Sequence, residues 1–184
     1  QGSTLAEGIA VKTIGEKTLK ICRDLVDDIL LVNEDEIEKA LGILLTIEKT
    51  VSEGAGACPL AALIRYPEIF KDKKVGLIVT GGNIDTRLLA SILMRSLVRD
   101  GRITRLRIEL PDIPGALSII SSIIGNKGGN IIDVSHHRLF TELPAKETYS
   151  NITLETRDAQ HLQDILDELR EEGFVVSVNR NIDM

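Results

Sequence analysis

Hydrophobic and polar positions alternate in the second half of the chain. In TRLRIEL, residues 104–110, the leucines and the isoleucine fall on one face, and Arg105, Arg107 and Glu109 fall on the other. This period of two predicts a strand with one buried face. Three more runs, NIIDVSHHRL, TYSNITLETR and FVVSVN, predict further strands, the first two joined by a polar loop around residues 140–147.

Two segments between these strands carry apolar residues at helical spacing. One begins at Pro114, a residue that the first turn of a helix tolerates, and the other covers about 158–172. The order βαββαβ packs two helices on one face of a four-stranded antiparallel sheet. We therefore expect residues 102–184 to form a complete α+β domain of ferredoxin-like type, with the domain boundary at Gly101–Arg102.

The first half, residues 1–101, has the pattern of an α/β fold. The apolar runs DDILLV (27–32) and KKVGLIVT (73–80) do not alternate, which predicts strands buried on both faces. Helical spacing predicts helices over about 17–26, 34–50 and 85–99, and a further helix in SEGAGACPLAALIRYP. Asn33 and Glu36 predict a capping box at the start of the second helix. The small residues 54–57 would let another helix or a ligand come close.

A glycine turn follows the second of these apolar runs. Thr80 leads directly into Gly81-Gly82-Asn83 and a helix, so the turn lies at the carboxyl end of a predicted strand, where open α/β sheets bind ligands. A plain connection between strand and helix explains this pattern equally well. The turn lacks the lysine and the further glycines of a phosphate-binding loop.

Composition narrows the class of protein. The net charge is −6 and aromatic residues make up 3% of the chain, so neither a basic face nor a stacking platform for nucleic acid is expected. Cys22 and Cys58 are too few for a disulfide or metal framework and suggest buried thiols in a reducing compartment. No apolar run approaches the ~20 residues of a membrane helix. We expect a cytoplasmic protein without membrane or nucleic-acid partners. The sequence opens with QGS and no methionine, which suggests that the chain is the C-terminal part of a longer protein.

The Pro111–Gly115 corner between the first strand and the first helix offers a particular chemistry. The amides at the start of a helix, together with its dipole, favour a carboxylate, and Gly115 lets a ligand approach them. Asp112 offers an anion for an ammonium group, and Asn130, after a second glycine corner, offers a donor and an acceptor. These groups suit a free α-amino acid. A capping aspartate and two ordinary turns are the alternative explanation.

The second half resembles the ACT domain, a small regulatory module that binds amino acids between paired copies. The resemblance rests on D-x-P-G-x-L and G-x-N-I, here Asp112 to Leu117 and Gly128 to Ile131, and covers essentially all of residues 102–184. It implies effector contacts at Asp112, Pro114, Gly115, Asn130 and Ile131. Some serine-binding members place a histidine where this chain has Leu110, which implies a less polar effector such as isoleucine or valine.

The first half resembles the threonine/serine dehydratase family, pyridoxal-phosphate enzymes of the fold shared with tryptophan synthase β. Four segments in order carry the likeness: LAEGIAVKTIGEKT, VDDILLVNEDEI, VSEGAGACPLAAL and KKVGLIVTGGNID. The likeness implies conversion of threonine to 2-oxobutanoate and ammonia by the intact enzyme. It also implies that Thr80 bonds the cofactor's ring nitrogen, that Glu53 lies near the ring, and that Gly81 and Gly82 let the ring edge approach.

The family's Schiff-base lysine motif and its glycine-rich phosphate loop do not occur in this sequence. We therefore expect no catalytic residue, no bound cofactor and no activity in this chain alone, which would be the C-terminal part of a catalytic domain plus a regulatory domain. A free-standing amino-acid sensor without catalysis is the alternative. A metal site at His136-His137 is not expected, because adjacent strand residues point to opposite faces. An exposed sheet edge predicts a homodimer through the second domain, with the intact enzyme a dimer or tetramer.

Overall fold

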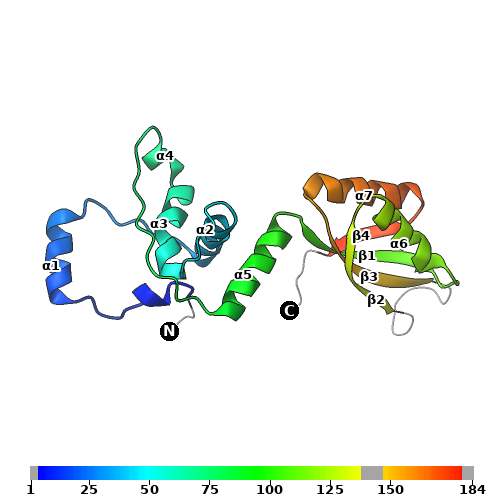
Figure 1. Ribbon diagram of the computed structural model, residues 1–184, viewed down its shortest axis with the longest axis horizontal. Helices are drawn as coiled ribbons and strands as arrows, with labels where there is room; N and C mark the ends of the chain where they lie inside the picture. Colours follow the sequence, from blue (N-terminus) through cyan, green and yellow to red (C-terminus); the bar gives the residue numbers. More distant parts are fainter. Residues whose placement is uncertain (1–3, 138–146, 180–184) are drawn as a thin grey trace. The chain divides into compact units, whose positions relative to one another are not determined.

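The computed structural model describes residues 4–137 and 147–179 and divides into two compact units, Gln1–Leu93 and Met94–Met184 (Figure 1). The division falls inside helix α5 (Thr86–Arg99). Gly101 lies two residues after the end of this helix and has a positive φ of +70°. Strand β1 begins two residues further on, at Ile103. The predicted boundary at Gly101–Arg102 thus lies between α5 and β1. Each unit is described separately below.

The second unit is the expected ferredoxin-like fold. Its four-stranded antiparallel sheet has the order β2-β3-β1-β4, with two helices between the strands in sequence. The elements are β1 (Ile103–Pro111), α6 (Ala116–Asn126), β2 (Asn130–His137), β3 (Glu147–Glu155), α7 (Ala159–Glu171) and β4 (Val175–Asn179). The alternation of polar and apolar residues therefore located all four strands. The polar loop predicted around 140–147 lies largely outside the described residues.

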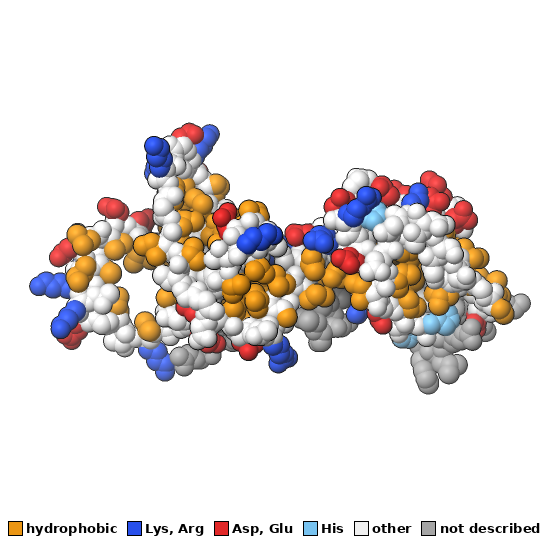
Figure 2. All heavy atoms as spheres, in the orientation of Figure 1, with side chains coloured by type: hydrophobic (Ala, Val, Ile, Leu, Met, Phe, Trp, Pro, Cys, Tyr) orange, Lys and Arg blue, Asp and Glu red, His pale blue; other side chains and the backbone are white. Residues whose placement is uncertain are grey.

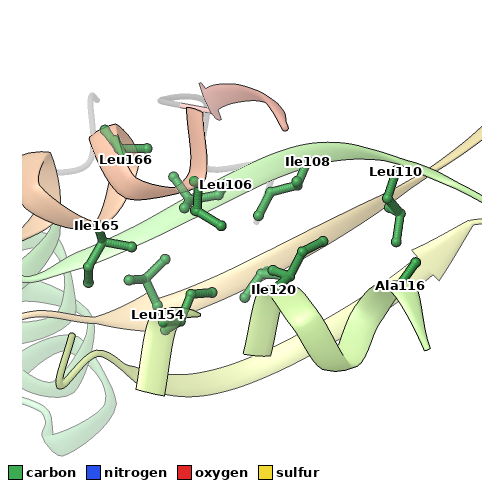
Figure 3. Close-up of a cluster of buried hydrophobic side chains, with 11 residues drawn as sticks. Leu106, Ile108, Leu110, Ala116, Ile120, Leu154, Ile165 and Leu166 are labelled. Carbon is green, nitrogen blue, oxygen red and sulfur yellow. The ribbon is translucent and has the colours of Figure 1, made fainter. Parts of the chain in front are cut away.

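Both helices cover one face of this sheet, and the core lies between the helices and the sheet (Figure 3). Leu106 and Ile108 of β1 are fully buried, and they meet Ile120 of α6 and Ile165 of α7 in one cluster. The remaining buried members are Leu110, Ala116, Ile124, Ile152, Leu154, Leu166 and Leu169. The cluster is aliphatic throughout, as expected for a chain with so few aromatic residues.

In the described part of this unit, no helix packs on the opposite face of the sheet, where the polar side chains of β1 lie. Arg107 lies there as predicted, and its guanidinium carbon lies 3.9 Å from the ring centre of Tyr149 on β3. The other neighbour of that ring is His137 of β2, stacked at 4.7 Å between ring centres. His136 points the other way, with Nδ1 2.7 Å from the hydroxyl of Ser150. Opposite orientation of the two histidines is therefore confirmed.

The first unit is mainly helical, with η1 (Glu7–Ile9), α1 (Glu16–Leu25), α2 (Glu34–Thr46), α3 (Gly54–Arg65), α4 (Pro67–Phe70) and the start of α5. Its core lies between α2 and α3, where Ala40, Ala57 and Ala61 are completely buried. The predicted capping box is present: the Glu36 amide donates to Asn33 Oδ1 over 3.0 Å, and the Asn33 amide donates to Glu36 Oε2 over 2.7 Å. α2 ends at Thr46, four residues earlier than predicted.

The two strands predicted in this unit are wrong for this chain. Residues 27–32 and 73–80 belong to no sheet, and most of their apolar side chains are exposed: Ile29 by 77%, Leu31 by 74% and Ile78 by 77%. Leu30 and Val32 are half-buried. Figure 2 shows hydrophobic side chains reaching the surface of this unit. A strand exists only when neighbouring strands take up its N–H and C=O groups. The described part of the first unit offers no such neighbour.

No helix among the described residues is long and apolar enough to cross a membrane.

Candidate functional sites

Two of the four cofactor-binding residues predicted in the first unit, Glu53 and Gly81, are in direct contact. The Glu53 amide donates to the carbonyl of Gly81 over 3.1 Å. Its carboxyl group lies against the α-carbon of Gly81, where an added Cβ would be 2.4 Å from Oε1. Gly81 has φ +69°, a conformation that favours glycine. Residues 28 positions apart in sequence are therefore in direct contact.

Two further glycines allow this arrangement. A Cβ on Gly54 would lie 2.0 Å from the carbonyl oxygen of Leu5, and a Cβ on Gly56 would lie 1.8 Å from that of Thr80. The small residues at the start of α3 thus admit the backbones of two non-helical segments. The sequence predicted close approach by a helix or a ligand, which is not what these two glycines contact.

Two residues near Glu53 were not predicted as site residues. A Cβ on Gly8 would lie 3.2 Å from Glu53 Oε1, and Ser52, 2% exposed, donates its hydroxyl to the carbonyl of Glu53 over 3.0 Å. Gly8 lies within LAEGIAVK, the first segment of the family likeness. Ser52 directly precedes Glu53, and nothing in the sequence pattern predicts that its side chain is buried.

The residues present could contact only part of a pyridoxal phosphate, namely its ring. Exposed Thr80 offers a hydroxyl for a ring nitrogen, and Gly82 is open, with Val51 O 3.6 Å from an added Cβ. Gly81 is less open, because the Glu53 carboxyl fills the space that a Cβ on Gly81 would take. With neither the lysine motif nor the phosphate loop in the sequence, no chemical step follows from these residues alone.

Cys58 of α3 is half-buried and carries no sign of nucleophilic activation. Its Sγ donates to the carbonyl of Gly54 over 3.4 Å. Burial raises the pKa of the Cys58 thiol, and the carboxylate of Glu34 adds to this effect. A raised pKa keeps the thiol protonated, so a lining role in the helix is the better description.

The Pro-Gly corner of the second unit has the open geometry that the amino-acid hypothesis requires. Gly115 is the N-cap of α6 with φ +90°, and a Cβ added there would meet nothing within 4 Å. The Ile113 amide donates to the Pro111 carbonyl over 2.9 Å, which turns the chain back toward the helix. Asp112 and Pro114 are exposed beside this corner.

A groove continues from this corner along α6. Its apolar part includes Ile113, 58% exposed, and Ile119, 52% exposed. The remaining lining residues are Pro114, Gly115, Ala116, Ser118, Ser122, Ile123, Asn126 and Glu172. An apolar groove that starts at helix-terminal amides can hold the side chain of a ligand whose carboxylate those amides bind.

Asn130 and Ile131 do not join this corner within one chain. Pro111 pairs with Glu147 at one end of the sheet, whereas Asn130 pairs with Glu155, whose other partner is Ile103 at the far end. β1 is 9 residues long, so the two ends are roughly 26 Å apart at ~3.3 Å per residue. The two glycine corners lie at opposite ends of α6, and one amino acid cannot touch both.

Among the described residues there is no group of three or more side chains suited to a metal ion.

Comparison with known proteins finds a different family in each half of the chain. Residues 1–81 match the family of pyridoxal-phosphate dependent enzymes, and residues 100–180 match the ACT domain. L-threonine ammonia-lyase of Geobacter sulfurreducens is 42% identical over 175 residues, which cover 95% of this chain and 44% of that enzyme. L-threonine ammonia-lyase of Thermotoga maritima is 37% identical over 175 residues, covering 95% and 43%. In the solved structure of serine racemase from Dictyostelium discoideum, 28% of that chain aligns with 46% of this one, at 36% identity and a TM-score of 0.42.

The chain thus joins a segment of a pyridoxal-phosphate-dependent enzyme to an ACT domain. Across both parts it is similar to threonine ammonia-lyases. It spans less than half the length of the two relatives compared above.

Proposed function

We propose that the chain is the regulatory portion of a pyridoxal-phosphate-dependent threonine ammonia-lyase, an enzyme that converts L-threonine to 2-oxobutanoate and ammonia. Its ACT domain binds an amino-acid effector such as isoleucine or valine. The observation that carries the proposal is the open Pro-Gly corner of an ACT domain in a chain that matches threonine ammonia-lyases over 95% of its length.

The chemistry of the corner supports an amino acid as the ligand. The amides of Ala116 and Ser118 donate to the carbonyls of Ile113 and Gly115, so the Leu117 amide and the helix dipole are what favour the ligand's carboxylate. The carboxylate of Asp112 suits its ammonium group. Leu110 is 3% exposed and belongs to the core, so it offers no polar group to a serine hydroxyl. The isoleucines that line the groove suit a branched aliphatic side chain.

The opposite positions of the two corners support a site shared between two copies. In a two-fold pair with antiparallel α6 helices, the Pro-Gly corner of one copy faces Asn130 and Ile131 of the other, and two equivalent sites result. β2 is an edge strand and carries exposed apolar residues, Ile132 at 50% and Val134 at 39%. We therefore place the homodimer contact along β2 and α6, with the intact enzyme a dimer or tetramer.

In the intact enzyme, Thr80, Gly81, Gly82 and Glu53 would lie against the pyridoxal phosphate. The cofactor would supply an electron sink for elimination, and Thr80 would hold its ring nitrogen through a neutral hydroxyl. This chain alone would bind no cofactor and have no activity. A cytoplasmic location remains a prediction, as does the ACT boundary at Gly101–Arg102.

A free-standing amino-acid sensor is the second candidate, favoured by the closed core of the second unit. The genomic sequence upstream of Gln1 separates the two functions. An in-frame lysine motif of the Ser-x-Lys-x-Arg-Gly-Ala type supports the dehydratase, and its absence from the reading frame supports the sensor.

Calorimetric titration of the chain with isoleucine, valine, threonine and serine tests effector binding. We expect saturable binding of a branched-chain amino acid that Asp112→Ala abolishes. Glu109→Ala is the matched control, because this carboxylate lies three residues before Asp112, on the helix-free face of β1. Equal binding by both variants, or no heat with any of the four amino acids, would contradict the proposed site.

A further inference from the structure

His161 is a buried ionisable side chain that belongs to neither candidate site. It lies in the first turn of α7 and is 4% exposed. Its own amide donates to the N-cap residue Asp158 over 2.8 Å, so its backbone position is fixed by the cap. The side chain then reaches from α7 to the end of α6.

Both ring nitrogens of His161 have hydrogen-bond partners, one at the end of α6 and one just before the start of α7. Nε2 lies 2.8 Å from the carbonyl oxygen of Lys127, the C-cap residue of α6. Nδ1 accepts from the Arg157 amide over 3.1 Å and from Arg157 Nε over 3.4 Å. Because two donors point at Nδ1, that nitrogen holds a lone pair, and the proton is on Nε2. The neutral Nε2–H ring therefore ties the end of α6 to the start of α7.

The carbonyl that His161 holds is directly followed by the second glycine corner. Gly128 has φ +83° and donates to the Gly125 carbonyl over 2.9 Å, and Gly129 donates to that of Ile124 over 2.9 Å. A Cβ on Gly129 would lie 2.8 Å from Ile124 Cγ2 and 2.9 Å from Ile165 Cδ1. The corner thus packs closely against both helices. Asn130, the next residue, is the first residue of β2.

We propose that His161 is a positioning residue for the effector site. Its Nε2–H fixes the Lys127 carbonyl and with it the path of residues 127–130, so that Asn130 and Ile131 face the Pro-Gly corner of a second copy. This inference rests on the proposed function, because it assigns to His161 an effect on effector affinity. His161 acts only through the corner and does not touch the ligand.

The test compares variants that each retain only one of the two hydrogen-bonding positions of the ring. His161→Asn keeps an oxygen near the position of Nδ1 but loses the donor to Lys127, whereas His161→Gln carries an amide that reaches the position of Nε2. Lys127→Met is the control, because it removes the ion pair to Glu168 (2.8 Å) and leaves the Lys127 carbonyl in place. Urea unfolding first shows that each variant is folded.

Isoleucine and valine are then titrated by calorimetry, and the Asn130 amide is followed by NMR. We expect His161→Asn to weaken effector affinity about tenfold and to shift the Asn130 amide resonance, while His161→Gln stays within about threefold of wild type. Lys127→Met leaves affinity unchanged. In the wild type, ¹⁵N spectra of the ring show the Nε2–H form.

Three results would overturn the inference: wild-type affinity in His161→Asn, an unshifted Asn130 amide in that variant, or a wild-type ring protonated on Nδ1 alone. If the wild type binds neither amino acid, the proposed function fails and the effect on affinity fails with it. Binding by the wild type and equal binding by His161→Asn refutes the role of His161 only.

Discussion

Glu53 and Gly81 are held together twice, by the 3.1 Å hydrogen bond from the Glu53 amide to the Gly81 carbonyl and by the Glu53 carboxyl lying on the Gly81 α-carbon. This contact joins the start of α3 to the glycine turn and brings together half of the predicted cofactor residues. It also makes Gly81 harder to replace than Gly82, which has room for a Cβ.

We expect Gly81→Ala to lower the free energy of unfolding of the first unit by roughly 1–3 kcal/mol, because it adds left-handed strain and a steric overlap. Urea unfolding measures the loss. Gly82→Ala is the control, since its Cβ would make ordinary contact with Val51 O at 3.6 Å, and it should change little. Equal losses in the two variants would contradict the assignment. Adding Glu53→Ala to Gly81→Ala should recover the part that is due to overlap.

The capping box at Glu36 predicts a pH dependence. The bond from the Asn33 amide lowers the pKa of Glu36 from its ordinary value of 4.5, and Arg65, 2.9 Å away, adds to this effect. A lowered folded-state pKa stabilises the fold above about 4.5, and this contribution is lost as the pH falls through the folded-state pKa. Glu36→Gln should therefore be less stable than wild type at neutral pH, and the difference should shrink in acid.

Unfolding curves of both proteins at neutral and acidic pH measure this difference. Asp35→Asn serves as the control, because it removes a charge from the same first turn but takes no part in the box. A difference between Glu36→Gln and wild type that does not depend on pH would show that the carboxylate charge is not the cause.

The dimer contact along β2 predicts an asymmetry between the two sheet edges. Val134→Lys places a charge in the proposed contact and should give monomers at concentrations where the wild type is dimeric. Val175→Lys changes an exposed valine, 61% accessible, on the opposite edge strand β4 and should leave the dimer intact. Light scattering after size exclusion measures both. A wild type that is monomeric at high concentration would refute the dimer.

Effector binding should follow the same asymmetry, because the proposed site takes Asp112 from one copy and Asn130 from the other. Val134→Lys should therefore weaken isoleucine or valine binding together with dimerisation. Val175→Lys should change neither. Full affinity in a monomeric Val134→Lys variant would show that a single Pro-Gly corner suffices.

The sequence alone determined the second unit almost completely. Leu106, Ile108 and Leu110 alternate with charged residues, and this pattern is sufficient for a strand whose partners are nearby in the same chain. The helices and the capping box followed from spacing and from Asn33 and Glu36, which act within one turn. Such local signals need no knowledge of the rest of the fold.

Only the tertiary structure decided the rest. The apolar runs at 27–32 and 73–80 were read as strands, but a strand depends on neighbours that its own residues do not specify. Likewise, Asp112 and Asn130 are only 18 positions apart in sequence, yet α6 and the antiparallel register set them at opposite ends of the sheet. Sequence showed which groups suit an amino acid, and the register showed that one copy cannot bring them together. The reason is that β1 and β2 are both antiparallel to β3 and so run in the same direction, which puts the end of β1 and the start of β2 at opposite ends of the sheet.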